Sequence, residues 1–213
     1  MKNLKQFGLV ALLAAPLAVQ AATVTYDMRS NGSAGYTSGS ITVTGSDGST
    51  VDASASNSSD DLTSYILSGP IGLFVCTGSG APTGHCGAGY GDQPHADGVG
   101  ANETVTLDFG HRMVRLVEAT FYLGASGRSL SGNFDLGVDG NPVDDEMTLS
   151  TLVSFLGLDA LSHTGSTFSF SADGDNDWFK LTSITVKEVP LPGTLGLLGL
   201  GLAALGMRRR QTS

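Results

Sequence analysis

The chain has 213 residues, with 11 lysines and arginines against 20 aspartates and glutamates, and a net charge of −9. This acidic balance argues against nucleic-acid binding, because affinity for phosphates depends largely on basic side chains. Glycine, serine, threonine and aspartate are abundant, which suits short strands joined by turns and would also suit a disordered chain.

The N-terminal stretch MKNLKQFGLVALLAAPLAVQA (1–21) has the parts of a signal peptide. Lys2 and Lys5 form a basic start, residues 7–19 are apolar, and small residues occupy the two positions that signal peptidases recognise. We therefore expect cleavage after Ala21 and export of the remainder. An uncleaved anchor is the alternative, which the shortness of the apolar stretch disfavours.

Residues 22–188 form the predicted folded domain. Removing both ends of the chain leaves six basic and all 20 acidic residues, a net charge of −14. The length fits one domain of ordinary size, and the charge favours solubility or the binding of cations.

Strand patterns begin directly after the signal peptide. TVTYDM (23–28) and SITVTG (40–45) alternate apolar and polar residues, and IGLFV (71–75) is a short apolar run. A weak strand is expected near Val51. The segment from 77 to 100 contains too many glycines and prolines for regular structure, and a loop of this length is often functional.

Two cysteines, Cys76 and Cys86, lie at the start of this long loop. In an exported chain such a pair predicts a disulfide, which would stabilise the fold by about 2–3 kcal/mol through loop closure. A metal site that includes His85 is the alternative, although zinc sites usually have closer cysteines and more ligands.

The second half of the chain has clearer alternation. Apolar residues recur at every second position in five segments: ETVTLDF (103–109), RMVRLVEATFYLG (112–124), GNFDLGVDG (132–140), STFSFSA (166–172) and WFKLTSITVKE (178–188). The phase slips at Thr182 and Ser183, which predicts a β-bulge. The segment TLVSFLGLDALS (151–162) is ambiguous and would suit a short helix or helical turn. The fold class is therefore all-β, an antiparallel β-sandwich resembling a jelly roll.

Asp173, Asp175 and Asp177 alternate in the segment SADGDNDWFKL and offer hard oxygen ligands for calcium. The spacing is not that of an EF-hand, because Trp178 stands where that loop has glycine. The simpler interpretation is a polar hairpin turn between two strands. Both are kept, since crowded carboxylates repel one another unless a cation is present.

Asp139, Gly140, Asn141 and Pro142 form a turn signal, and residues 144–146 are three further acids that suit a solvated loop. The four histidines are scattered and are expected on the surface or in turns. Catalytic motifs such as His-Glu-x-x-His and Gly-x-Ser-x-Gly are absent from the sequence, so we expect no enzymatic activity.

Trp178 is the candidate ligand-binding aromatic residue. Adjacent strand residues point to opposite faces, so Trp178 should lie outside and offer a surface for a sugar if Phe179 is inside. The alternative is that Trp178 belongs to the core.

The C-terminus, VPLPGTLGLLGLGLAALGMRRRQTS (189–213), is an apolar run followed by arginines. Residues 191–207 carry no charge and would form a helix of about 26 Å, close to the thickness of a bilayer core. The arginines Arg208, Arg209 and Arg210 would then lie on the cytoplasmic side, with the domain outside. A core helix of the domain is the alternative.

This tail resembles the PEP-CTERM sorting signal, with the motif Val189, Pro190, Leu191 and Pro192 in the Val-Pro-Leu-Pro variant, then the helix and the arginine cluster. The resemblance implies that an exosortase in the inner membrane recognises the motif and processes the tail. It also implies a Gram-negative, exopolysaccharide-producing host. Residues 90–187 resemble a β-rich domain type that often precedes such tails and for which no enzymatic activity is implied.

Three functions remain open at this point. The first is an exported, non-catalytic surface or extracellular-matrix protein that associates with exopolysaccharide. The second is a carbohydrate-binding module with Trp178 and a calcium-stiffened loop, and the third is a hydrolase with an unrecognised acidic site.

Overall fold

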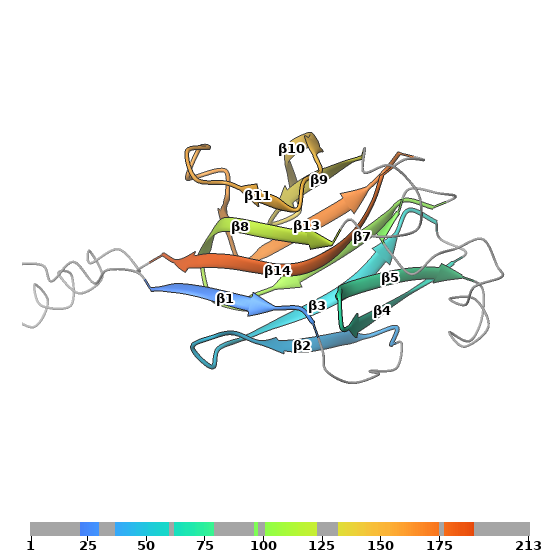
Figure 1. Cartoon of the computed structure of the whole chain (residues 1–213), viewed down its shortest axis with the longest axis horizontal. Helices are drawn as coiled ribbons and strands as arrows, with labels where there is room; N and C mark the ends of the chain where they lie inside the picture. The colour runs from blue at the N-terminus through green and yellow to red at the C-terminus, as the bar shows by residue number, and fades with distance from the viewer. Residues whose placement is uncertain are drawn as a thin grey trace, which may run out of the picture. The chain divides into compact units, whose positions relative to one another are not determined.

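The computed structural model describes residues 22–29, 37–59, 62–78, 96–97, 101–122, 132–174 and 177–189. Its strands pair antiparallel and form two sheets that face each other (Figure 1). One compact unit spans Ala21–Val189. The predicted all-β, sandwich-like architecture is confirmed for this part, whereas the signal peptide and the C-terminal helix lie outside the described residues.

The first sheet is organised around the closing strand of the domain. Its order is β11 (Leu152–Ser154), β8 (Val114–Tyr122), β14 (Trp178–Glu188), β5 (Gly72–Gly78) and β4 (Thr63–Gly69). Three further strands pair at its margins: β1 (Thr23–Asp27) and β6 (Ala96–Asp97) with β14, and β12 (Thr164–Gly165) with β8.

The second sheet has six strands. Their order is β10 (Asn141–Thr148), β9 (Asn133–Val138), β13 (Thr167–Ala172), β7 (Glu103–Asp108), β3 (Thr50–Asn57) and β2 (Ser40–Thr44). The weak strand expected near Val51 is therefore an internal strand, β3, which pairs with β2 and β7.

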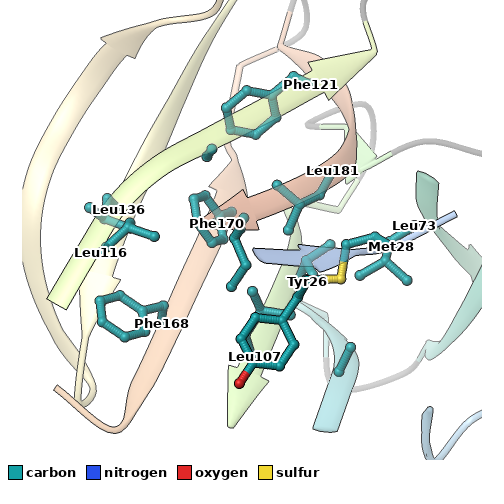
Figure 2. Close-up of a cluster of buried hydrophobic side chains, with 14 of the residues drawn as sticks. Tyr26, Met28, Leu73, Leu107, Leu116, Phe121, Leu136, Phe168, Phe170 and Leu181 are labelled. Atoms are coloured by element: carbon teal, nitrogen blue, oxygen red, sulfur yellow. The ribbon is translucent and has the colours of Figure 1, made fainter. Parts of the chain in front are cut away.

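The core lies between the sheets and is filled by the side chains that the alternation places inward. Figure 2 shows members of this cluster from both sheets. Aromatic contacts cross the gap between the sheets. The ring centroid of Phe121 in β8 lies 5.0 Å from that of Phe134 in β9 and 6.0 Å from that of Phe170 in β13. Phe179 of β14 lies 5.4 Å from Phe121. These edge and tilted arrangements add to the hydrophobic stabilisation.

The predicted irregularity in β14 is present. Its register against β8 shifts between Leu181 and Ser183, and again between Thr185 and Val186. The first shift is the bulge expected at Thr182 and Ser183. It returns Ile184 to the core side, so that both halves of the strand bury their apolar residues.

The turn between β9 and β10 also matches the sequence pattern. Asp139 and Gly140 both have positive φ, 49° and 77°, as a two-residue type I′ hairpin requires. The Asp139 Oδ1 atom accepts hydrogen bonds from the backbone N–H groups of Ser166 and Thr167, each at 2.9 Å. The carboxylate thereby fastens this turn to the start of β13.

The ambiguous segment 151–162, which suits a short helix or helical turn, contains no helix. It forms β11 and then a series of turns, in which His163 N–H donates to Asp159 O at 3.4 Å across one helical turn. One expectation is wrong. The connection between β13 and β14 is not a hairpin, because these strands belong to different sheets. It crosses from one layer to the other, since β13 pairs with β7 and β9 while β14 pairs with β8.

His163 lies in a turn, which is one of the two placements expected for the histidines, but it is buried, with 2 % of its side chain exposed. Its Nε2 lies 2.6 Å from Asp144 Oδ2, and its Nδ1 lies 2.8 Å from the carbonyl oxygen of Asp159. The ring packs against Phe155 with centroids 5.4 Å apart. His163 therefore joins the turns after β11 to β10.

We expect His163→Ala to lower the free energy of unfolding by about 3 kcal/mol, because it removes a buried ring and leaves its hydrogen-bond partners unpaired. Urea denaturation measures this. His111→Ala, at an exposed position, is the control and should change the value by less than about 0.5 kcal/mol. Equal midpoints for both variants would contradict the role assigned to His163.

Candidate functional site

Five carboxylates meet at one end of the second sheet. Asp135 is on β9, Asp145 and Glu146 are on β10, and Asp173 and Asp177 flank the connection from β13 to β14. The pairing of β9 with β10 and with β13 brings the two sequence-distant acidic segments within electrostatic range of each other. We call these five residues the acidic cluster.

Local strand geometry explains why these acids converge. On β9, Phe134 and Leu136 face the core, so Asp135 between them faces outward. The β10 strand shifts register between Pro142 and Met147, and Glu146 adopts a positive φ of 56°. This bulged geometry lets the Glu146 N–H donate to Asp135 Oδ1 at 2.9 Å.

Asp177 has a structural role within the cluster. It is buried, and each of its oxygens accepts a backbone hydrogen bond, from Asn133 N at 2.7 Å and from Gly174 N at 2.9 Å. Such charge-assisted bonds hold the connection between the sheets in place. Two of the lone-pair directions that a metal ion would use are thereby occupied.

The cluster is electrostatically strained. Burial raises the pKa of Asp135; the hydrogen bond from Glu146 N–H lowers it, and the negative charges of Asp173 and Asp145 raise it again. Partial desolvation also raises the pKa of Asp173, although its side chain is exposed, and the charges of Glu146, Asp177 and Asp145 raise it further. Both shifts have the sign expected when carboxylates lie close together.

The predicted calcium ligands are only partly covered by the structure. Asp173 and Asp177 lie in the acidic cluster, whereas Asp175 lies outside the described residues. Within the described part, no group of three or more histidine, cysteine or acidic side chains is arranged to hold a metal ion. The calcium site therefore stays a prediction.

The expectation that Trp178 faces solvent is wrong. Phe179 is fully buried, but Trp178 is also buried, with 8 % exposed. Alternation places the two side chains on opposite faces, yet the outer face is covered here as well, since the neighbouring strand β5 buries both Phe74 and Cys76. Trp178 therefore offers no open platform for a sugar ring.

The structure describes one of the two cysteines of the predicted disulfide. Cys76 is fully buried on β5, opposite Tyr65 of β4. Cys86 lies outside the described residues, so the pairing stays a prediction.

A groove that the sequence did not indicate lies between β1 and β2, with a volume of about 400 Å³. The two strands meet at the bridge between Tyr26 and Gly45 and belong to different sheets. Arg29 donates two hydrogen bonds to Asp27, at 2.8 and 2.7 Å. The other lining residues are Ile41, Thr42, Val43, Thr44 and Ser68. This lining combines aliphatic side chains and hydroxyl groups with a carboxylate and a guanidinium that pair with each other.

The sorting motif begins where the domain ends. Val189 N–H donates to the carbonyl oxygen of Met113 at 3.0 Å, one residue after β14 finishes. Pro190, Leu191, Pro192 and the arginines 208–210 lie outside the described residues. Among the residues that the structure covers, no helix has both the length and the apolar character needed to span a bilayer.

The raised pKa of Asp173 predicts a pH-dependent stability. Below the ordinary carboxyl pKa of about 3.9, Asp173 is protonated in both the folded and the unfolded state and costs no stability. As the pH rises through the higher pKa of the folded state, ionisation of Asp173 lowers the stability of the folded domain. Asp173→Asn removes this loss. The melting temperature of the variant, relative to the parent, should therefore rise between pH ~3 and pH ~7.

Asp47→Asn is the matched control, because hydrogen bonds from Ser49 lower the pKa of Asp47. The stabilisation by this carboxylate is present above the ordinary pKa and is lost in acid, so the variant should be relatively less stable at neutral pH. If both variants followed the same trend with pH, the electrostatic strain assigned to the acidic cluster would be refuted.

Comparison with known proteins places the tail in a family of signals. No curated protein and no solved structure matches the chain. The family model described as the PEP-CTERM protein-sorting motif matches residues 188–210, which include the last residue of β14 and the whole predicted motif. The chain thus carries a PEP-CTERM sorting motif directly after its β-sandwich domain.

Proposed function

We propose that this protein is an exported, non-catalytic surface or extracellular-matrix protein that an exosortase sorts and processes through its tail. The observation that carries the proposal is the sorting motif at residues 188–210. The motif implies export and exosortase-dependent sorting. In this proposal the signal peptide starts export, the tail helix holds the chain in the inner membrane with Arg208–Arg210 on the cytoplasmic side, and processing sends the domain to the surface.

The position of the motif supports processing without loss of fold. The pairing of β14 ends at Glu188, and the last described backbone bond of the domain is that of Val189. A cut beyond this residue removes none of the strand pairs described above. The processed domain would therefore keep its two sheets.

A non-catalytic role agrees with the polar groups of the domain. Both ring nitrogens of His163 are engaged by Asp144 and Asp159, so this buried histidine is not placed to act on a bound substrate. Both carboxylate oxygens of Asp177 likewise accept hydrogen bonds from backbone N–H groups. These acids and this histidine contribute to the fold.

The exosortase role predicts a specific mature species. From the native host, intact mass should show a chain that begins near Ala22 and ends near Val189 or Pro190, released from the inner membrane only when the exosortase is present. Pro192→Ala should retain the full tail, because the motif would be lost. Pro142→Ala, at an exposed position on β10, is the matched control and should be processed normally.

A full tail retained in the inner membrane, with and without the enzyme, would refute the sorting proposal. The chain would then be a domain with a permanent anchor. Normal processing of Pro192→Ala would refute the assigned motif but not export.

A carbohydrate-binding module with a calcium-stiffened loop is the second candidate, because the acidic cluster crowds five carboxylates whose repulsion a cation would relieve. The groove between β1 and β2, rather than Trp178, is then the polar surface for the glycan. A net charge of −14 on the body disfavours an anionic polysaccharide unless calcium bridges the two.

This candidate predicts that calcium chloride raises the melting temperature, since a cation that binds only the folded state stabilises it by about 2.7 kcal/mol at 100 times its Kd. The double variant Asp135→Asn with Asp173→Asn should lose the effect, whereas Asp47→Asn should keep it. Retention on the host's purified polysaccharide should fall for Arg29→Ala. Equal melting temperatures with and without calcium would remove the calcium-stiffened loop from consideration.

A further inference from the structure

The exposed large hydrophobic side chains of the described residues gather along one margin of the first sheet. They belong to two segments: the stretch from β11 to β12, and the pair of residues where the domain meets the tail. Leu161 is 83 % exposed and Leu156 is 64 % exposed. The full set is Met113, Leu152, Leu156, Leu158, Leu161 and Val189. We call this set the apolar margin.

Backbone hydrogen bonds bring the turns that carry Leu156, Leu158 and Leu161 to the end of the sheet where Met113 and Val189 lie, whereas Leu152 pairs with Thr120 further along β8. Val189 N–H donates to Met113 O, immediately before β8 begins. Phe155 N–H donates to Val117 O, and Leu116 N–H donates to His163 O, each at 2.9 Å. The turns between Phe155 and His163 therefore project beside the start of β8. Figure 1 shows them toward the end of the sandwich where β14 finishes.

The leucines are held outward by the packing beneath them. Phe155 is fully buried and His163 is fixed to Asp144, so the two ends of the turn segment are anchored. Leu156, Leu158 and Leu161 lie between these two anchors and remain exposed. A gathering of exposed apolar side chains on a soluble domain indicates a contact surface.

The charges at this end differ from those of the rest of the domain. Arg115 and Lys187 are directly opposite each other on β8 and β14, although like charges in this position repel. Arg112 is close by and pairs with Glu188 at 3.5 Å. The acids Glu118 and Asp159 also lie near this end, as does Asp144, which contacts His163. An anionic group beside Arg115 and Lys187 would relieve their repulsion.

We propose that the apolar margin rests on the phospholipid bilayer while the tail is still attached. The leucines enter the lipid interface, and Arg115 and Lys187 face lipid phosphates. This inference rests on one part of the proposed function, namely that the tail anchors the chain in the membrane. Pro190 follows directly on Val189, so every anchored copy holds this end within a few residues of the membrane. At an effective concentration of about millimolar, even a weak surface is occupied.

Site-specific crosslinking of the full chain tests this proposal. The protein is reconstituted in nanodiscs of phosphatidylethanolamine and phosphatidylglycerol, with benzoylphenylalanine in place of Leu161. We expect a lipid adduct by mass spectrometry after illumination. The same probe in place of Thr42, exposed on the second sheet, should form several-fold less.

Two variants identify the groups responsible. Leu156→Ser with Leu158→Ser should reduce the adduct at position 161 several-fold, with an unchanged melting temperature as evidence of folding. Arg115→Gln with Lys187→Gln should reduce it in discs that contain phosphatidylglycerol and have little effect in phosphatidylcholine alone.

Equal adducts at positions 161 and 42, or none at 161, would overturn the proposal. So would a probe at 161 that crosslinks to the exosortase and not to lipid in native membranes, which would assign the margin to the enzyme. The nanodiscs contain no exosortase, so failure of the sorting proposal leaves this result unaffected.

Discussion

Packing of aromatic side chains between the two sheets fixes the register on which the rest of the domain depends. Phe121 and Phe179 project from the first sheet onto Phe134 and Phe170 of the second. A shift of one residue in any of these strands would turn its phenylalanine to the outer face. The bulge in β14 follows from the same constraint, because it lets the long closing strand keep both Phe179 and Ile184 inside.

The two-layer arrangement also creates the acidic cluster. Because β13 and β14 lie in different sheets, the segment between them crosses the end of the sandwich instead of turning back in a hairpin. Asp173 is thereby brought within electrostatic range of Asp145 and Glu146 of β10. Asp177 stabilises the crossing through backbone N–H groups, while Asp135 and Asp173 carry the strain. The acids that hold the crossing in place and those whose pKa values are raised are thus different members of one cluster.

Features that depend on residues close in the sequence could be predicted, whereas features that depend on residues brought together by the fold could not. Alternation identified most of the described strands, and the residue types of Asp139 and Gly140 identified the turn after β9, because both depend on local backbone geometry. It did not identify β4, or β10, whose acidic residues 144–146 suggested a loop. Burial of Trp178 was missed because alternation gives the face of a strand and not what covers that face. The partners of His163 were missed because Asp144 and the turn at Asp159 meet it only through the fold.

The tail and the fold are joined through a single strand. β14 pairs with β1, β5, β6 and β8, so it holds the first sheet together and also leads directly into the sorting motif. Its pairing ends at Glu188, which separates the residues that stabilise the sandwich from those that an exosortase would read. β14 completes its pairing with β8 and β1 before the motif begins. An anchored chain can therefore keep its fold at the membrane, and a chain cut beyond Val189 keeps every described strand pair.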